Sequence, residues 1–435
     1  MVDHPRSRPP VAYSRPTDSE HSQVSRGLTE PVARSLEYWA AVRGGTPALF
    51  EGKVSLTYRE WNEYADMLAD AFAGRGLGLD DVVAIYCRNR IEWAVIALAC
   101  AKIDARLLTL DMDTDPQTVR DRLVAGRASA LIVGDMAPIR LFGALDGLPL
   151  KLKASMDGAH PAFFNFWDLF PPVAPPRFGA AQPFLMAWTA HAGNGAQPVG
   201  LPRRRAAPAS LAPPPVPDFG ATLITVPLHR TWGPGQFWTA LIAGRSIALM
   251  RDFEPAAALE TIADRRITHW AALPETLALL RDFGIDEARL ASMASLRELV
   301  MGGAPAPMAL KKWLSDTFGA IFNEAYGSPE TGLIAWMAPQ QRANRPDSCG
   351  RPMRGVSVEV RDANGQRLPN GVPGQIWART QRSLECELPP ESHDNRRDAD
   401  GFVATGDAGL VDEDGYIYLT GRADALDHVR PWRTG

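Results

Sequence analysis

Residues 82–110 determine the expected fold and read VVAIYCRNRIEWAVIALACAKIDARLLTL. A short β-rich run at Val82–Tyr86 precedes an apolar, helix-like stretch over residues 91–101, and a second strand-like run follows at 107–110. Two strands joined by a helix of this length are typical of a parallel sheet that helices cover on both faces. The segment therefore predicts a protein of the α/β class.

The same alternation extends to both sides of this segment. Upstream, Thr57 and Glu60 have the spacing of a capping box, which satisfies free amides at a helix start, and Gly74 marks the helix end. Downstream, helices and short apolar runs alternate as far as residue 322, with one interruption between about residues 151 and 218. The expected strands are 131–133, 222–226, 247–250, 296–300 and 321–322, and the expected helices include 255–263, 274–280 and 307–318.

Proline explains the interruption. The chain has 37 prolines in 435 residues, well above the usual ~5%, and they concentrate between Pro171 and Pro217. Proline lacks the backbone N–H that a central strand or a helix interior needs. We therefore expect a surface excursion or a partly disordered insert at about 168–218.

Beyond Gly350 the pattern changes to strands and tight turns, at residues 356–360, 375–378 and 409–419. The predicted organisation is a disordered tail at 1–26 and a large domain of two doubly wound α/β subdomains at 27–350. An appended β-rich subdomain follows at 351–421, and a hinge remnant at 422–435.

Composition narrows the class of function. The 46 basic and 50 acidic residues give a formal charge of −4, so no basic surface is expected that would attract nucleic acid. The first 26 residues lack the apolar core of a signal peptide, and the most apolar stretch, 93–101, is far shorter than the ~20 residues of a membrane span. The four cysteines form no CxxC pair. These features predict a cytoplasmic protein without a disulfide framework or structural zinc.

Two glycine-containing segments follow expected strands. Residues 301–305 read MGGAP, and the glycines Gly302 and Gly303 would let the backbone approach a flat ligand closely. Taken alone, the segment is better explained as an ordinary strand-to-helix turn. Residues 323–332 read NEAYGSPETG and gather an aromatic ring, hydroxyls and a carboxylate in one expected loop. Glu330 can ligate magnesium there, and Thr331 can donate to a phosphate.

Two further segments carry charge next to glycine. Residues 405–407 read TGD, and residues 420–424 read TGRAD. A fixed carboxylate such as Asp407 can accept both hydroxyls of a ribose, and Arg422 offers donors for a ribose hydroxyl or a phosphate. Taken singly, each segment is explained as well by a surface salt bridge.

Together, in this order and spacing, the four segments resemble the adenylate-forming superfamily, which includes acyl-CoA synthetases, aryl-CoA ligases, luciferases and the adenylation domains of peptide synthetases. The resemblance runs from about Leu56 to Asp424. For the adenine, the resemblance implies that Gly302, Gly303 and Ala304 flank the base and that Tyr326, beside Gly327, stacks on it. For the rest of the nucleotide, it implies that Asp407 holds the ribose diol, that Arg422 binds ribose, and that Glu330 and Thr331 meet magnesium and the α-phosphate. It also implies that Asp424 is the hinge residue and that His229 of Pro227-Leu228-His229 lines the acyl pocket.

The sequence departs from the family pattern in two places. The family's phosphate loop is rich in Ser, Thr and Gly and ends in Pro-Lys-Gly, whereas residues 188–200 read WTAHAGNGAQPVG and have Val199 at the lysine position. Removing one well-aimed donor from a charge-stabilising site costs about 10²–10³ in rate. The family also continues past the hinge aspartate into a C-terminal lid domain, whereas this chain ends at Gly435, so we expect the large domain alone.

These departures predict an acid–thiol ligase of the acyl-CoA synthetase type that binds a carboxylic acid as its acyl-adenylate, with impaired or absent adenylation from ATP. Thioester formation with CoA would depend on the missing lid. The resemblance implies AMP or an acyl-adenylate as ligand, with ATP, CoA and Mg²⁺ as family ligands, and leaves open a separate adenylating enzyme as partner. The alternatives are an ordinary ATP-dependent acyl-CoA synthetase and a catalytically dead scaffold. Trp232, Phe237, Trp238 and Trp336 suggest a roomy site for a hydrophobic or aryl acid. Aromatic residues at this spacing are, however, more often part of the core.

Overall fold

The computed structural model describes residues 32–135, 139–158, 160–170, 186–188, 198–199, 219–230, 232–328, 331–380 and 397–423. Several sequence predictions lie outside these residues. They concern the tail at 1–26, most of the proline-rich excursion and of the phosphate segment, Glu330, and the hinge segment from Asp424 onward.

The strand–helix–strand unit expected from residues 82–110 is confirmed. Strand β3 (Val82–Tyr86) pairs in parallel with β4 (Arg106–Leu110), and the intervening helix α4 (Ile91–Lys102) is buried along nearly its whole length. A helix that is apolar on all sides must be enclosed on all sides. Its side chains share one core cluster with Val83 of β3 and with Leu49 and Ile247 of another sheet, so the helix lies between two sheets.

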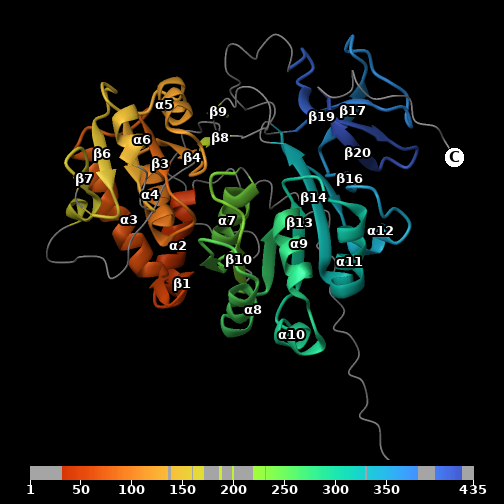
Figure 1. Cartoon of the computed structure of the whole chain (residues 1–435), viewed down its shortest axis with the longest axis horizontal. Helices are drawn as coiled ribbons and strands as arrows, with labels where there is room; N and C mark the ends of the chain where they lie inside the picture. Colours follow the sequence, from red (N-terminus) through yellow and green to blue (C-terminus); the bar gives the residue numbers. More distant parts are fainter. Residues whose placement is uncertain are drawn as a thin grey trace, which may run out of the picture.

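The first sheet, as far as the described residues show it, has seven strands in the order β7-β6-β5-β3-β4-β8-β9 (Figure 1). All neighbouring pairs are parallel except β8 with β9. The strands not yet given are β5 (Ala130–Val133), β6 (Leu152–Ser155), β7 (Phe164–Asn165), β8 (Met186–Trp188) and β9 (Pro198–Val199).

The second sheet has nine strands among the described residues, in the order β16-β15-β14-β13-β12-β10-β11-β1-β2. Its centre, β11-β10-β12-β13-β14, is parallel. The strands are β1 (Pro47–Glu51), β2 (Val54–Thr57), β10 (Ala221–Ile224), β11 (Ser246–Leu249), β12 (His269–Ala272), β13 (Glu298–Gly302), β14 (Phe322–Ser328), β15 (Gly332–Met337) and β16 (Arg351–Pro352).

Helices cover these two sheets, and the capping box at Thr57 is present: the Thr57 hydroxyl accepts from the Glu60 amide, and the Thr57 amide donates to the Glu60 carboxylate at 2.8 Å. The helices are α2 (Val32–Arg43), α3 (Tyr58–Ala73), α5 (Pro116–Ala125), α6 (Ile139–Ala144), α7 (Trp232–Ile242), α8 (Pro255–Asp264), α9 (Pro274–Phe283), α10 (Glu287–Ser292), α11 (Met308–Phe318) and α12 (Pro339–Arg342). Of the described helices, none combines the length and the apolar character that crossing a membrane requires.

The C-terminal part forms the expected β-rich unit, an antiparallel sheet of β17 (Ser357–Arg361), β18 (Gly374–Arg379), β19 (Val403–Val411) and β20 (Ile417–Arg422) (Figure 1). One face of this sheet packs against the second sheet, because Ile376, Ala378 and Ile417 share a core cluster with Tyr326 and Ile334. The packing brings β19 next to β14.

The structure corrects two sequence interpretations. Residues 323–328 belong to strand β14, not to a loop, because this stretch pairs with β13 on one side and β15 on the other. The alternation also does not stop at residue 151, because β6 (Leu152–Ser155) pairs with β5, and Phe166 and Leu169 are buried in the core.

A buried cluster of ion pairs connects the two large sheets. The Arg90 guanidinium holds the Glu92 carboxylate with two bonds, of 2.7 and 2.5 Å, and lies 3.7 Å from Asp135. Arg251, which follows β11, contacts the same Asp135 at 3.2 Å and also pairs with Glu51 of β1. Breaking any of these contacts would leave a charged side chain without its ion-pair partner between the two sheets.

This cluster predicts a pH-dependent stability. Burial raises the pKa of Glu92 to about 7, although Arg90 opposes the shift. The folded state therefore binds a proton more tightly than the unfolded state, so the stabilisation from protonated Glu92 is complete below pH ~4.5 and is lost as pH rises through 7. We expect wild type to lose about 2 kcal/mol more stability between pH 5 and 8 than Glu92→Gln. Urea unfolding at both pH values checks this, with Glu63→Gln on the exposed face of α3 as control; parallel pH profiles would contradict it.

Candidate functional site

The carboxyl ends of the central parallel strands of the second sheet meet at one edge. Strand β13 ends at Gly302, which lies opposite Ala325 of β14, and Tyr326 follows immediately. The connection after β10 brings His229 from the same end of its strand. In open α/β sheets, this edge is where ligands bind, so it is the place to look for the predicted site residues.

Tyr326, Asp407 and Arg422 come together here. The Tyr326 hydroxyl donates to Asp407 Oδ2 at 2.9 Å and lies 3.2 Å from Thr405 Oγ1. The Arg422 guanidinium donates to the other carboxylate oxygen, Oδ1, at 2.8 Å. Three residues that the sequence placed in separate motifs therefore form one cluster, which spans the second sheet and the β-rich sheet.

The local backbone explains the order Thr-Gly-Asp. The Thr405 hydroxyl donates to the Ile376 carbonyl at 3.0 Å and accepts from the Asp407 amide, which fixes the turn of the strand. Gly406 has φ +76°, and a Cβ at this position would collide with the Arg422 guanidinium. The left-handed backbone favours glycine here, and a side chain would also displace the Arg422 guanidinium from this position.

Tyr326 is held as a neutral donor. Its side chain is buried, and burial together with the neighbouring Asp407 carboxylate raises the pKa of the phenol well above its usual value. At neutral pH the hydroxyl therefore keeps its proton and directs it toward Asp407. The Asp407 side chain is 19% exposed to solvent. The cluster presents a fixed anionic acceptor at the edge of the sheet.

The two glycines at the end of β13 lie under an aromatic ring. A Cβ on Gly302 would stand 3.1 Å from the Trp232 ring and 2.9 Å from the Ala325 carbonyl, and a Cβ on Gly303 would stand 3.3 Å from Trp232 Cβ. The flat group that these glycines admit in this structure is thus the chain's own indole. Sequence reasoning named Trp232 only as part of a roomy aromatic region.

Thr331 is buried and engaged with its neighbours. Its hydroxyl lies 2.8 Å from the Ser328 hydroxyl, and its carbonyl accepts from the Thr380 hydroxyl at 2.7 Å. Among the residues placed by the structure, no group of three or more His, Cys, Asp and Glu side chains is arranged to hold a metal. The predicted magnesium ligand, Glu330, is outside those residues.

His229 sits in the β10–α7 connection and faces the first sheet. Its Nε2 lies 3.4 Å from Asp111, which directly follows β4. Burial lowers the pKa of the imidazole, and the Asp111 carboxylate only partly opposes this shift. The ring is therefore mainly neutral at pH 7, and it links the carboxyl ends of strands from both sheets.

A buried triad that sequence reasoning missed lies below the Tyr326 cluster. Glu324, two residues before Tyr326, accepts from Lys311 at 2.7 Å and from Arg342 at 3.0 Å. All three side chains are less than one-tenth exposed. The alternation of a strand could have indicated that Glu324 points to the same side as Tyr326, but its partners come from α11 and α12.

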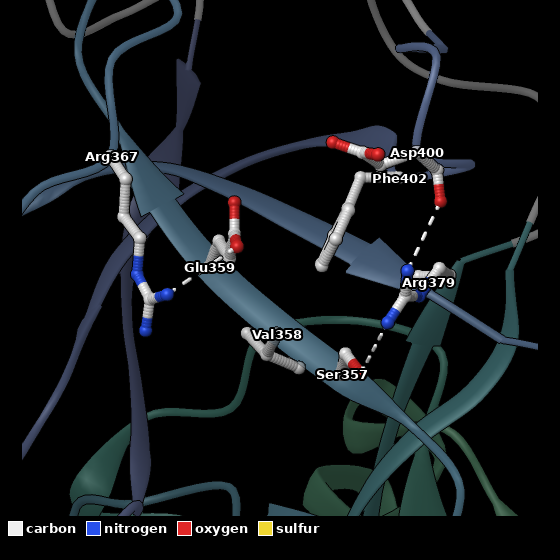
Figure 2. A pocket seen from close by; sticks show the side chains of 7 residues that line it. All are labelled: Ser357, Val358, Glu359, Arg367, Arg379, Asp400 and Phe402. Carbon is white, nitrogen blue, oxygen red and sulfur yellow. Dashed lines mark hydrogen bonds and ion pairs between the residues drawn. The ribbon is translucent and has the colours of Figure 1, made fainter.

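A hollow of about 470 Å³ lies elsewhere, on the β-rich sheet (Figure 2). Its two arginines already have protein partners: Arg367 pairs with Glu359, and Arg379 donates to the Asp400 carbonyl. The hollow is lined by Phe402, which clusters with Trp377, whereas the adjacent Ile376 packs toward Tyr326. Side chains alternate across a strand, so the hollow faces away from the Tyr326 cluster.

Comparison with known proteins places this chain in a family. The sequence model of the AMP-binding enzyme family matches residues 36–161 and 214–385. The 4-coumarate–CoA ligase 1 of Oryza sativa subsp. japonica is 25% identical over 422 residues, which cover 88% of this chain and 73% of the relative.

Solved structures of similar fold agree with this family assignment. The amide bond synthetase McbA of Marinactinospora thermotolerans is 25% identical with a TM-score of 0.71, and the match covers 90% of this chain and 79% of that one. The anthranilate CoA ligase AuaEII, solved with anthranoyl-AMP, has the same fold with a TM-score of 0.75 at 21% identity, over 91% of this chain and 77% of that one. This chain belongs to the AMP-binding enzyme family, the adenylate-forming superfamily that its motifs predict, and is similar to the family's acyl-CoA ligases.

Proposed function

We propose that this chain binds a carboxylic acid as its acyl-adenylate at the edge of the second sheet. The observation that carries the proposal is the Asp407 carboxylate held between Tyr326 and Arg422. A carboxylate fixed in this way can accept both hydroxyls of a ribose, as an acidic residue does in dinucleotide-binding folds. In this proposal Asp407 holds the ribose, Arg422 assists it, and Tyr326 with Gly327 faces the adenine.

The remaining predicted residues take supporting roles in this proposal. Gly302, Gly303 and Ala304 flank the adenine side of the edge, Thr331 meets the α-phosphate, and His229 lines the acyl pocket. Glu330 is the proposed magnesium ligand, and magnesium would neutralise phosphate charge there. With the family's lid domain in place, the CoA thiol would lose its proton and attack the acyl carbon of the adenylate, and AMP would leave as the thioester forms; this makes the chain an acid–thiol ligase in type.

The phosphate segment, residues 188–200, bears on whether the chain can form the adenylate from ATP. Val199 stands where the family has lysine, and residues 189–197 supply one hydroxyl, from Thr189. The terminal phosphates of ATP would then lack a cation and several donors, each worth about 2.7–4 kcal/mol in the transition state. We therefore expect adenylation from ATP to be poor, with the adenylate supplied by a second enzyme.

The test compares ligands that end at the α-phosphate, AMP and an acyl-adenylate mimic, with ATP, which carries the two terminal phosphates as well. Calorimetry with AMP, with a non-hydrolysable acyl-adenylate mimic and with ATP is expected to show that the mimic binds at least tenfold more tightly than ATP. Pyrophosphate exchange with ATP and benzoate, cinnamate or octanoate is expected to stay near background.

Two other outcomes have different meanings. Robust pyrophosphate exchange would show an ordinary ATP-dependent acyl-CoA synthetase whose altered segment still works. Absence of binding for AMP, ATP and the mimic would favour a scaffold that has the fold without the chemistry, because fold alone does not establish function.

A further inference from the structure

One buried side chain of the first sheet holds the backbone of the β10–α7 connection. Asn89 lies in the short link between β3 and α4 and is only 3% exposed. Its carboxamide nitrogen donates to the Val226 carbonyl at 3.0 Å, and its carboxamide oxygen accepts from the Leu228 amide at 2.7 Å. Asn89 therefore bonds the chain on both sides of Pro227, which has no N–H of its own.

The chain beyond these two bonds is a close-packed turn that contains His229. The Arg230 amide donates to the Pro227 carbonyl at 3.0 Å, and the Gly233 amide donates to the Arg230 carbonyl at 3.0 Å. A Cβ on Gly233 would stand 2.6 Å from the Pro227 carbonyl. Because the turn is fixed at both ends, a shift of the backbone at Pro227 would move His229 as well.

The His229 side chain is held from the same edge of the first sheet. Its Nε2 lies 3.4 Å from the Asp111 carboxylate, and Asp111 directly follows β4, as Asn89 follows β3. Strands β3 and β4 are parallel neighbours, so their carboxyl ends lie side by side. One edge of the first sheet thus supplies a contact for the backbone of this turn and another for its imidazole.

We propose that Asn89 is a positioning residue for the acyl half of the ligand: its carboxamide fixes residues 227–229 and thereby sets the place of the His229 imidazole against the acyl group. Hydrogen bonds have narrow ranges of distance and angle, so this pair of bonds fixes the backbone more closely than apolar packing would. The first sheet therefore takes part in acid binding. This inference rests on the proposed function, in which His229 lines the acyl pocket.

Calorimetry with two ligands tests this role. The ligands are AMP and whichever of benzoyl-, cinnamoyl- and octanoyl-sulfamoyl adenosine, which mimic acyl-adenylates, binds wild type most tightly. Asn89→Leu keeps nearly the same volume and removes both hydrogen bonds, so we expect it to weaken binding of the mimic about tenfold. Its affinity for AMP should stay within about twofold of wild type, because AMP carries no acyl group.

A double variant distinguishes positioning of His229 from a general loosening of the fold. His229→Ala alone should also weaken binding of the mimic about tenfold. If Asn89 acts through His229, then Asn89→Leu combined with His229→Ala should bind the mimic about as tightly as His229→Ala does, because two changes that remove one shared contact do not add.

Thr268→Val is the matched control. The Thr268 hydroxyl also bonds buried backbone of β10, because it accepts from the Ala221 amide at 3.0 Å and lies 3.1 Å from the Ala221 carbonyl, but Ala221 is at the amino end of that strand. This variant should keep the wild-type affinity for both ligands. Asn89→Asp is the milder second variant: it keeps the acceptor for the Leu228 amide and should weaken the mimic about threefold, which tests the role even where Asn89→Leu does not fold.

The outcomes separate this inference from the proposed function. The role of Asn89 is overturned if its variants bind the mimic like wild type, if they lose as much affinity for AMP as for the mimic, or if the losses add in the double variant. If His229→Ala binds the mimic like wild type, the acyl-pocket role of His229 is wrong and this inference falls with it, whereas the ribose role of Asp407 stands. If wild type binds neither AMP nor any mimic, the proposed function itself fails.

Discussion

Replacing Asp407 with alanine is expected to weaken AMP binding about 100-fold or more. In the proposed complex, Asp407 accepts two hydrogen bonds from the ribose, and a hydrogen bond to a charged group contributes about 1.5–3 kcal/mol. Losing about 3 kcal/mol corresponds to roughly two powers of ten in Kd. The change also removes the partner of Arg422 and the acceptor of the Tyr326 hydroxyl.

Calorimetry with AMP and with an acyl-adenylate mimic measures this effect. Tyr326→Phe keeps the ring and removes one donor to Asp407, so its effect should be smaller, within about tenfold. Glu359→Gln is the matched control, because Glu359 lines the hollow on the β-rich sheet (Figure 2) and pairs with Arg361 instead of with Asp407 or Tyr326. A folded Asp407→Ala variant with wild-type AMP affinity would refute the ribose role.

Replacing Glu324 with alanine is expected to lower the free energy of unfolding by about 3–5 kcal/mol. The change leaves Lys311 and Arg342 buried with no carboxylate between them, and removing one partner of a buried ion pair leaves an uncompensated charge in a low-dielectric environment. Arg342 also lies over the Phe322 ring at 4.5 Å. The guanidinium is therefore packed in place and cannot easily move to solvent.

Urea unfolding followed by circular dichroism measures this loss. Asp316→Ala is the control, on the helix α11 that also carries Lys311: it breaks the exposed Lys312–Asp316 pair, and exposed pairs contribute at most about 1 kcal/mol. Combining Glu324→Gln with Lys311→Met and Arg342→Met removes all the charges together, and should recover much of the stability. If Glu324→Ala costs no more than Asp316→Ala, the triad is not a buried electrostatic unit.

Short-range patterns account for the parts of the fold that the sequence predicts well. The capping box at Thr57 and the strand β3 are set by residues within a few positions of one another. The prediction failed at residues 323–328, where Asn323, Gly327 and Ser328 resemble loop residues. They form a strand because β13 and β15 supply hydrogen-bonding partners on both sides, and that pairing is invisible in a local window.

For the candidate site, too, the sequence predicts one part, the residue types, and not the other, their arrangement in space. Its residue types can be read from short motifs, since a carboxylate, an aromatic hydroxyl and an arginine next to glycines are typical of nucleotide sites. Their assembly cannot, because Tyr326 and Asp407 are 81 positions apart and meet only when the β-rich sheet packs on β14. The Trp232 indole over Gly302 and the Glu324 triad likewise depend on neighbouring elements.

The sequence by itself determined the α/β class, the order of most elements and the chemical groups available at the site, because backbone propensity, capping and side-chain alternation act over a few residues. Only the tertiary structure decided that β1 joins the second sheet, with Leu49 beside Ile247, and that the indole of Trp232 covers the glycines. Such contacts form between segments far apart in the chain, and they are selected by the burial of whole faces, not by any local pattern.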